Sequence, residues 1–248
     1  MKVTIVIPTY NEAENLPQLL SAIFKLNLPE LDILVVDDNS PDGTGQIAED
    51  KGKEYQERVK VLHRSGKLGL GTAYIQGFQI ALENGAEAVG QMDADFSHPP
   101  EKVTELIQAL EGCDVALGSR YVSGGSLDER WPLWRKALSA FGNTYARTIL
   151  RLPVNDVTGG FRLYRRETLL AMPLKCIRSN GYVFQVEMAY IAYLLGFRFR
   201  EVPIYFADRR WGQSKMSFRI QLEAAIRVWQ LPGMYRGLGR SRPPIHPD

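Results

Sequence analysis

The chain has 248 residues, of which 45% are hydrophobic and 23% are charged, so it is long and apolar enough to form a core of its own in one large or two small domains. Its formal net charge of +2 gives no indication of nucleic-acid binding, and we expect no such partner. The sequence shows no signal peptide, and no charge-free segment is long and apolar enough to span a bilayer.

The first part of the chain alternates between short apolar segments and amphipathic segments. This alternation is typical of βαβ units, so we predict an α/β fold with a Rossmann-like, mostly parallel sheet and helices on both faces. Asn15 is the expected cap of the first helix. The predicted strands cover 3–8, 31–36, 59–62, 86–90 and 114–118, and the predicted helices cover 15–24, 45–57, 72–83 and 100–110.

The pattern changes after Tyr121. A helix over 132–150 has a stripe of apolar residues that we expect to face the core, and a helix over 183–195 carries Glu187, for which we favour a structural role. Strands are predicted over 161–164 and 197–206, and a last amphipathic helix over 217–231. The apolar stripe of the helix over 132–150 consists of Trp134, Leu138, Phe141, Tyr145 and Ile149. That of the helix over 217–231 consists of Phe218, Leu222, Ala225 and Trp229.

Polar clusters follow several predicted strands. Ligands of parallel α/β sheets bind beyond the carboxyl ends of the strands, so these clusters predict a site at that edge of the sheet. The clusters are Thr9–Glu12, Asp37–Asp42, Asp93–His98 and Ser119–Tyr121.

Within the third cluster, Asp93 and Asp95 are separated by one residue. An extended backbone would project both carboxylates to the same side, where their repulsion would favour a bound cation. A hard divalent ion such as Mg²⁺ or Mn²⁺, bridging to a diphosphate, fits these oxygen ligands. The alternative is a solvated turn with Asp95 near the start of the next helix, and His98 is interpreted as a turn residue.

Two other nucleotide-binding motifs match poorly. A dinucleotide-binding motif requires a glycine-rich turn after the first strand, where the chain has Pro8-Thr9-Tyr10-Asn11-Glu12. A P-loop requires a glycine at Val61 and Ser or Thr at Leu68. Both alternatives are therefore weakly supported.

The C-terminal part is basic, which favours an anionic partner, either a phosphate group or a membrane surface. A solvated helix face followed by a disordered end explains the same charges. The two cysteines, Cys113 and Cys176, lack metal-type spacing, so we interpret both as small buried hydrophobes in a reducing, cytoplasmic compartment. From Asp208 to Arg242, two anions accompany eight cations: Arg209, Arg210, Lys215, Arg219, Arg227, Arg236, Arg240 and Arg242.

Taken together, the motifs resemble those of family-two inverting glycosyltransferases with the GT-A fold and, more narrowly, the polyprenol (dolichol) phosphate mannosyltransferases. The resemblance runs from Lys2 to about Ser217 and implies a catalytic domain at 1–216, followed by an amphipathic helix and a basic, flexible tail at 217–248. The motifs are Ile7–Glu12, Val35–Thr44, Leu68–Tyr74, Met92–His98, Gly118–Tyr121, Thr158–Tyr164, Gly181–Gln185 and Gly212–Lys215.

The resemblance also implies roles for individual residues. Ser97 stands where some members have a metal-coordinating Gln, so its contact would be weaker or made through water. The residues implied to bind the guanine nucleoside are Pro8, Tyr10, Glu12, Val36 and Asp38. The diphosphate would be met by Asp93, Ala94 and Asp95, with Asp95 the direct metal ligand. The acceptor phosphate would face Arg120 and Arg135, and Arg209 and Lys215 would lie on a loop that closes over the donor.

The implied reaction transfers mannose from GDP-mannose to a polyprenyl phosphate with inversion, assisted by Mg²⁺ or Mn²⁺. A phosphate monoester has a second pKa of about 6 and is mostly dianionic at neutral pH, so we expect no strong general base. Many members carry C-terminal membrane helices. Without them, we expect peripheral contact with an anionic membrane at its cytoplasmic face, through the helix over 217–231 or a membrane-anchoring partner. Transfer of glucose or another sugar, and a non-catalytic nucleotide-binding scaffold, remain alternatives.

Overall fold

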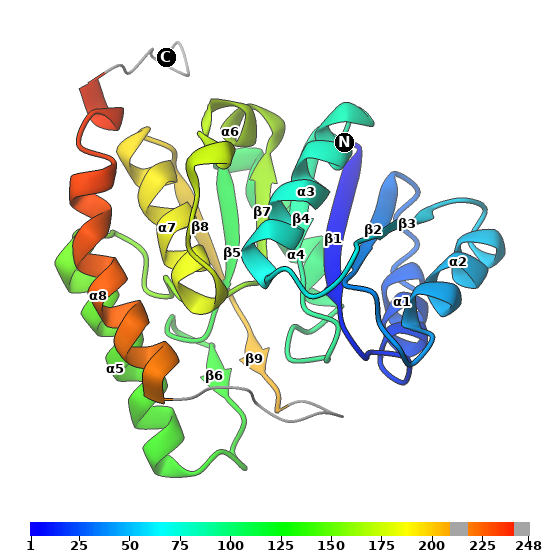
Figure 1. Cartoon of the computed structure of the whole chain (residues 1–248), viewed down its shortest axis with the longest axis horizontal. Helices are drawn as coiled ribbons and strands as arrows, with labels where there is room; N and C mark the ends of the chain where they lie inside the picture. The colour runs from blue at the N-terminus through cyan, green and yellow to red at the C-terminus, as the bar shows by residue number, and fades with distance from the viewer. Residues whose placement is uncertain (209–217, 241–248) are drawn as a thin grey trace.

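The computed structural model describes residues 1–208 and 218–240. Within these ranges, a seven-stranded sheet lies at the centre of the molecule and a two-stranded sheet lies beside it. The strands are β1 (Val3–Thr9), β2 (Leu31–Asp37), β3 (Val59–His63), β4 (Ala88–Gln91), β5 (Val115–Ser119), β6 (Ser126–Leu127), β7 (Arg162–Arg165), β8 (Phe199–Pro203) and β9 (Tyr205–Phe206). The large sheet has the order β3-β2-β1-β4-β7-β5-β8, and β6 pairs with β9 (Figure 1).

Helices cover both faces of the large sheet. One face packs against α1, α2 and α4, and the other against α3, α5, α7 and α8, each forming a separate core cluster with alternate strand residues. The helices are α1 (Leu16–Phe24), α2 (Thr44–Glu54), α3 (Leu70–Glu83), α4 (Lys102–Ala109), α5 (Leu133–Leu150), α6 (Arg166–Ala171), α7 (Gly181–Leu194) and α8 (Phe218–Met234), with 3-10 turns at Leu110–Gly112, Leu174–Cys176 and Leu238–Arg240.

Strand β1 pairs in parallel with both β2 and β4. Its residues Ile5, Val6 and Ile7 are fully buried, as expected for a β-branched strand covered on both faces. The predicted α/β fold with a mostly parallel sheet, helices on both faces and a C-terminal helix is therefore confirmed.

Strand β7 runs antiparallel to its neighbours β4 and β5. Its first residue, Arg162, lies opposite Gln91 at the end of β4 and Leu117 near the end of β5. The loop before β7 therefore reaches the same edge as the carboxyl ends of the parallel strands. We call this edge the carboxyl edge.

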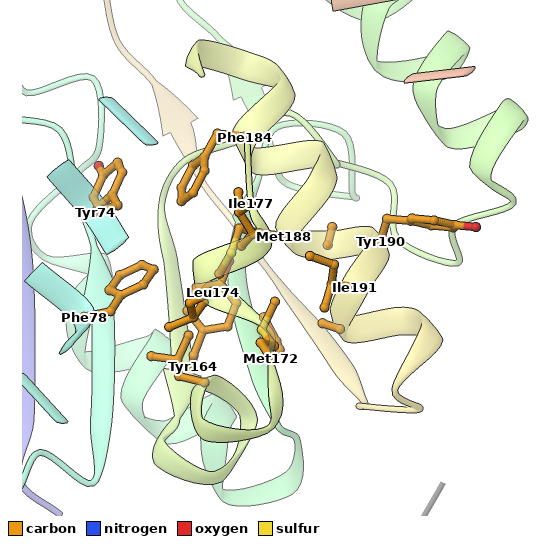
Figure 2. Close-up of a cluster of buried hydrophobic side chains, with 14 of the residues drawn as sticks. Tyr74, Phe78, Tyr164, Met172, Leu174, Ile177, Phe184, Met188, Tyr190 and Ile191 are labelled. Carbon is orange, nitrogen blue, oxygen red and sulfur yellow. The ribbon is translucent and has the colours of Figure 1, made fainter. Parts of the chain in front are cut away.

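An aromatic cluster joins α3 to α7 beneath the carboxyl edge. Figure 2 shows Tyr74 and Phe78 of α3 facing Phe184 of α7, and the rings of Tyr74 and Phe184 stack with centroids 5.8 Å apart. Burial raises the pKa of the Tyr74 hydroxyl well above its usual value, with the charge of Asp93 adding to the effect. The Tyr74 hydroxyl thus remains a proton donor held in place by packing.

Three local predictions are wrong. Asn15 precedes α1 but has helical backbone angles and no capping bond; its amide donates to Glu12 Oε2 at 2.7 Å instead. The strand predicted over 197–206 divides into β8 and β9, because its partner β5 ends at Ser119 and the chain then pairs with β6. Cys176 is exposed, although Cys113 is buried.

The apolar stripe of α5 also differs from expectation, whereas that of α8 had no predicted buried face. On α5, Trp134 and Phe141 are each 67% exposed instead of facing the core. On α8, Trp229 is 65% exposed, while Val228 and Leu231 form the buried contact. In the described part of the chain, no helix combines the length and apolar character that a bilayer span requires.

Candidate functional site

Asp93 lies just beyond the end of β4 and is held by two buried rings. The Tyr74 hydroxyl donates to its Oδ1 at 3.0 Å, and its backbone N–H donates to His98 Nδ1 at 3.0 Å. The Asp93 side chain nevertheless remains 36% exposed. The chain therefore presents a positioned carboxylate to the outside of the carboxyl edge.

His98 is more than the turn residue that the sequence predicted. It is 1% exposed and stacks on Phe161 with ring centroids 5.1 Å apart. Burial lowers its pKa, against the opposing charges of Asp93 and Asp95. A neutral imidazole whose Nδ1 accepts the Asp93 N–H fixes the backbone at the carboxylate.

The backbone is not extended through Asp95, as the sequence analysis assumed, but turns at Ala94 and Asp95. Phe96 has φ 63°, a left-handed conformation that is costly for a bulky residue and recurs at functional sites. Beyond it, the Ser97 N–H donates to Asp95 Oδ1 at 3.0 Å. Asp95 and Ser97 are both buried, at 6% and 2% exposure.

The donor set at this turn fits a divalent cation. Ser97 Oγ is buried without a hydrogen-bond partner among residues 1–208 and 218–240, beside the Asp95 carboxylate. No cluster of three or more His, Cys, Asp or Glu side chains arranged for a metal occurs in the same ranges. Mg²⁺ is commonly held by one or two carboxylates together with substrate phosphates and water, and this arrangement needs no larger cluster.

Asp38, after β2, forms a buried ion pair that the sequence analysis missed. Arg64 donates from Nη1 to Asp38 Oδ1 at 2.5 Å and from Nη2 to Thr72 Oγ1 at 2.6 Å. Burial raises the pKa of the Asp38 carboxyl, outweighing the opposite effect of Arg64. The pair joins the ends of β2 and β3 to the start of α3.

The other residues with implied nucleoside roles differ in accessibility. The Lys67 ammonium lies 4.4 Å from the centre of the Tyr10 ring, and Glu12 accepts the amide of Asn15. Pro8 is half-buried at the end of β1. Val36 is fully buried in the core and Ala94 is 4% exposed, so neither side chain has an open face toward a ligand. Lys67 was given no role in binding a nucleoside by the sequence analysis.

Arg120 is locked in a bidentate ion pair with Asp156. Its Nε and Nη2 donate to the two Asp156 oxygens at 2.7 Å each, and Nη2 also donates to Thr158 Oγ1 at 2.7 Å. Arg120 is 7% exposed and Asp156 is fully buried. Burial is the largest single influence and would raise the pKa of Asp156, but the charge and hydrogen bonds of Arg120, together with the charge of Arg162, outweigh it and lower that pKa. Asp156 was given no role by the sequence analysis.

The loop that carries Asp156 is fixed by the half-buried side chain of Glu201 and the buried side chain of Arg162. Glu201 accepts the backbone N–H of Asn155 at 2.8 Å and of Asp156 at 3.0 Å. Arg162, 1% exposed, donates to the carbonyls of Val157 and Gly159. The Arg120–Asp156 pair therefore sits on a rigid support.

Arg135 has a different setting at the start of α5. Its guanidinium lies 3.6 Å from the centre of the Trp131 ring and donates to Asp208 Oδ1 at 3.2 Å, and its side chain is 29% exposed. Asp208 is itself held through its backbone N–H by Asp128. Arg209 and Lys215 lie outside the described residues.

Glu187 of α7 occupies a wholly buried position and has structural contacts, as its mid-helix position suggested. It accepts the backbone N–H of Ser179 at 3.1 Å and the hydroxyl of Tyr235 at 2.6 Å. Burial, followed by the bond to Glu187, raises the pKa of Tyr235. These contacts join the start of α7 to the segment after α8.

Comparison with known proteins identifies close relatives. A family model described as "Glycosyl transferase family 2" matches residues 4–171. An undecaprenyl-phosphate mannosyltransferase of Micrococcus luteus is 47% identical over 240 residues, covering 96% of this chain and 98% of that protein. A polyprenol monophosphomannose synthase of Mycolicibacterium smegmatis is 44% identical over 232 residues, covering 92% and 87%.

Solved structures share the fold at lower identity. Glucosyl-3-phosphoglycerate synthase of Mycobacterium tuberculosis, crystallised with Mn²⁺, UDP and glucosyl-3-phosphoglycerate, superposes with a TM-score of 0.63 at 17% identity over 94% of this chain and 79% of that chain. The same enzyme with Mn²⁺ and UDP-glucose gives a TM-score of 0.64 at 18% identity, covering 94% and 78%.

Proposed function

Because the chain belongs to glycosyl transferase family 2, we propose that it transfers mannose from GDP-mannose to a polyprenyl phosphate with inversion, releasing GDP. The observation that carries this proposal is the full-length similarity to an undecaprenyl-phosphate mannosyltransferase. The carboxyl edge supports it, since carboxylates at one strand end and arginines at another suit a diphosphate held through a cation and a phosphate acceptor.

On the donor side, we assign the nucleoside to the loops after β1 and β2. Pro8, Tyr10, Glu12 and Asp38 form this binding region, and Val36 supports it from the buried core. Lys67 joins the assignment because it already lies over the Tyr10 ring, from which an ammonium group can reach a phosphate oxygen.

We assign the diphosphate and its cation to the turn after β4. Asp95, Asp93 and Ser97 would hold Mg²⁺ or Mn²⁺, and Ala94 lies between the two carboxylates. When bound, the cation stabilises the negative charge that develops on the departing diphosphate. Tyr74 and His98 keep Asp93 in place for this role through their hydrogen bonds.

On the acceptor side, Arg135 would bind the lipid phosphate and Arg120 would shape its site together with Asp156. Lys215 and Arg209 complete the assignment from the segment between the described ranges. Because the acceptor is already ionised at neutral pH, orientation by guanidinium groups replaces a general base. The displacement proceeds in line and inverts the anomeric centre.

We propose that residues 1–216 form the catalytic domain and that residues 217–248 contribute to peripheral attachment at the cytoplasmic face of an anionic membrane. Exposed Trp134, Phe141 and Trp229 on α5 and α8 support this proposal, since indole and phenyl rings favour the membrane interface. The two helices are joined by a hydrogen bond from Trp229 Nε1 to the Tyr145 hydroxyl at 2.8 Å. A membrane-anchoring partner would use the same face.

Vesicle sedimentation tests the membrane proposal. Replacing both Trp134 and Trp229 by Ala should reduce the bound fraction on anionic vesicles, whereas replacing exposed Leu170 by Ala, on a different helix, should leave it unchanged. Equal sedimentation of the double variant and the unmodified protein contradicts attachment through α5 and α8.

A donor panel tests the reaction. GDP-mannose, UDP-glucose and UDP-N-acetylglucosamine are assayed side by side on polyprenyl phosphate in detergent, each with Mg²⁺, with Mn²⁺ and with a chelator. We expect metal-dependent transfer from GDP-mannose alone. Transfer from UDP-glucose would change the sugar assignment, and GDP binding without any transfer would favour a scaffold subunit.

A further inference from the structure

The first turns of α7 place a buried glutamine behind the carboxyl edge. Gln185 is 3% exposed, and its backbone carbonyl accepts an N–H from Arg162 at 2.8 Å. Its side-chain Oε1 has no hydrogen-bond partner among the described residues. Since buried polar atoms are nearly always paired in folded proteins, this oxygen calls for a partner other than the described residues, either a bound ligand or a water.

Gln185 lies next to the groups that support Asp93. A Cβ atom at Gly160 would stand 3.2 Å from Gln185 Nε2 and 3.5 Å from His98 Cε1. His98 in turn accepts the backbone N–H of Asp93. The Nε2 end of the Gln185 amide thus faces His98 across Gly160, where a side chain would be in tight contact with the amide.

The chemistry of the unpaired atom restricts what can fill it. An amide oxygen accepts hydrogen bonds and requires an O–H or N–H donor. Ionised phosphate groups offer only acceptor oxygens, so neither the donor diphosphate nor an ionised acceptor phosphate can satisfy it. In the reaction proposed above, the hydroxyl groups of the transferred sugar are the donors nearest to the reacting atoms.

We propose that Gln185 is a specificity-determining residue whose Oε1 accepts a hydrogen bond from one hydroxyl of the transferred sugar. This role rests on the proposed sugar transfer. A sugar without that hydroxyl leaves the oxygen buried and unpaired, so the site discriminates against it. Gly160 contributes because a Cβ at its position would stand only 3.2 Å from Gln185 Nε2 and would press on the amide.

A buried water is the competing explanation. Gln91 Nε2 also lacks a hydrogen-bond partner among the described residues, and Gln91 lies opposite Arg162 in the sheet. A water that bridges the two glutamines would satisfy both without any sugar. If such a water is present, replacing Gln91 or Gln185 should change the stability of the protein in the same way. Neither side chain would then have a role in sugar selection.

Donor analogues that each lack one sugar hydroxyl distinguish these explanations. For the unmodified protein, we expect kcat/KM to fall about 10- to 100-fold for one analogue relative to the parent donor. For each analogue, the measured quantity is the ratio of kcat/KM for the parent donor to kcat/KM for the analogue. Gln185→Met should bring the one large ratio to within about threefold of unity and leave the ratios for the other analogues unchanged. Gln185→Glu retains an acceptor oxygen and should retain the discrimination.

Gln91→Met is the matched control and should keep the unmodified ratios. The affinity for GDP, which carries no sugar to be transferred, should be the same in Gln185→Met and the unmodified protein. Should Gln185→Met fail to fold, Gly160→Ala serves instead, since its methyl group would stand 3.2 Å from Gln185 Nε2, shift the amide and lower kcat/KM while GDP affinity persists.

Unchanged ratios in Gln185→Met, or the same altered ratios in Gln91→Met and Gln185→Met, would overturn the role of Gln185. The analogues are built on whichever nucleotide-sugar the donor panel selects. If GDP-mannose supports no transfer in that panel, the proposed donor is wrong. If the kcat/KM ratios do not change as expected in Gln185→Met, the role of Gln185 is wrong.

Discussion

The two sides of the carboxyl edge are built differently. On the nucleoside side, the loops after β1 to β4 hold their polar groups through partners from neighbouring strand–loop units, such as Asp38 with Arg64, 26 residues apart. On the arginine side, the loops around β5, β7 and α5 depend on more distant partners, such as Arg120 with Asp156, 36 residues apart, and Arg135 with Asp208, 73 residues apart. Tertiary contacts therefore hold both sides, and those of the arginine side span longer stretches of the chain.

The arginine side also contains a contrast of its own. Arg120 and Arg135 have the same implied role, yet Arg120 is buried against a buried carboxylate and Arg135 is partly exposed beside an exposed one. A charge that is already neutralised inside the protein supports the structure, while an accessible charge can exchange its partner for a ligand. The following predictions test this distinction, from the largest expected effect to the smallest.

Removing the buried partner should have the largest effect. Asp156→Ala leaves the Arg120 guanidinium buried and unpaired, which should lower the free energy of unfolding by about 3–5 kcal/mol. Asp208→Ala, which removes the exposed partner of Arg135, should lower it by about 0–1 kcal/mol. Urea denaturation measures both. Equal losses would show that the two pairs do not differ as their burial implies.

On the nucleoside side, an Asp93→Asn variant should reduce activity without loss of fold. The substitution removes the charge but keeps an oxygen for the Tyr74 hydroxyl, so we expect kcat/KM to fall about 10²- to 10³-fold at an unchanged melting temperature. Asp50→Asn, on the exposed surface of α2, is the control. Activity within about threefold of the unmodified enzyme would exclude a role for this charge in diphosphate departure.

Arg135→Ala tests whether the accessible arginine binds the acceptor. Loss of a charge-assisted hydrogen bond to phosphate should raise KM for polyprenyl phosphate about 10- to 100-fold, with little change in the KM for the sugar nucleotide. Lys136→Ala, which removes the positive charge next to Arg135 in the chain, is the matched control. If both variants raise KM equally, the effect comes from general positive charge and not from Arg135.

The smallest expected effect is the loss of stability at low pH that comes from the Arg120–Asp156 ion pair. The native pKa of Asp156 lies below its ordinary value, so its ion pair adds stability above the unfolded pKa of about 3.9 and loses it as pH falls through the native pKa. The stability difference between the unmodified protein and Asp156→Asn should therefore shrink below about pH 4. Urea unfolding at a series of pH values measures it, and a difference independent of pH would contradict the pairing.

Much of the fold followed from local patterns. The strands β1 to β5 and the helices between them were predicted to within a few residues, because β-branched segments and amphipathic segments differ in period. The location of Asp38, Asp93 and Asp95 beyond strand ends was predicted on the same basis. The chain turn at Ala94 was given only as the solvated alternative, because the spacing of two aspartates says nothing about the backbone between them.

The buried faces of α5 and α8 could not be predicted from the chain alone. A periodic apolar stripe shows that a helix has two sides, but the neighbouring elements decide which residues are covered. Trp229 remains exposed because α8 packs through Val228 and Leu231, with Tyr235 just beyond the helix reaching Glu187 on α7.

The sequence by itself determined the βαβ architecture and the acidic loop at Asp93, since hydrophobic period and strand-end position are local properties. Only the tertiary structure decided that β7 runs antiparallel, which brings Asp156 and Gly160 to the same edge. The physical reason is that strand direction and ion-pair partners depend on contacts between segments far apart in the chain, and these contacts form only when the sheet is assembled.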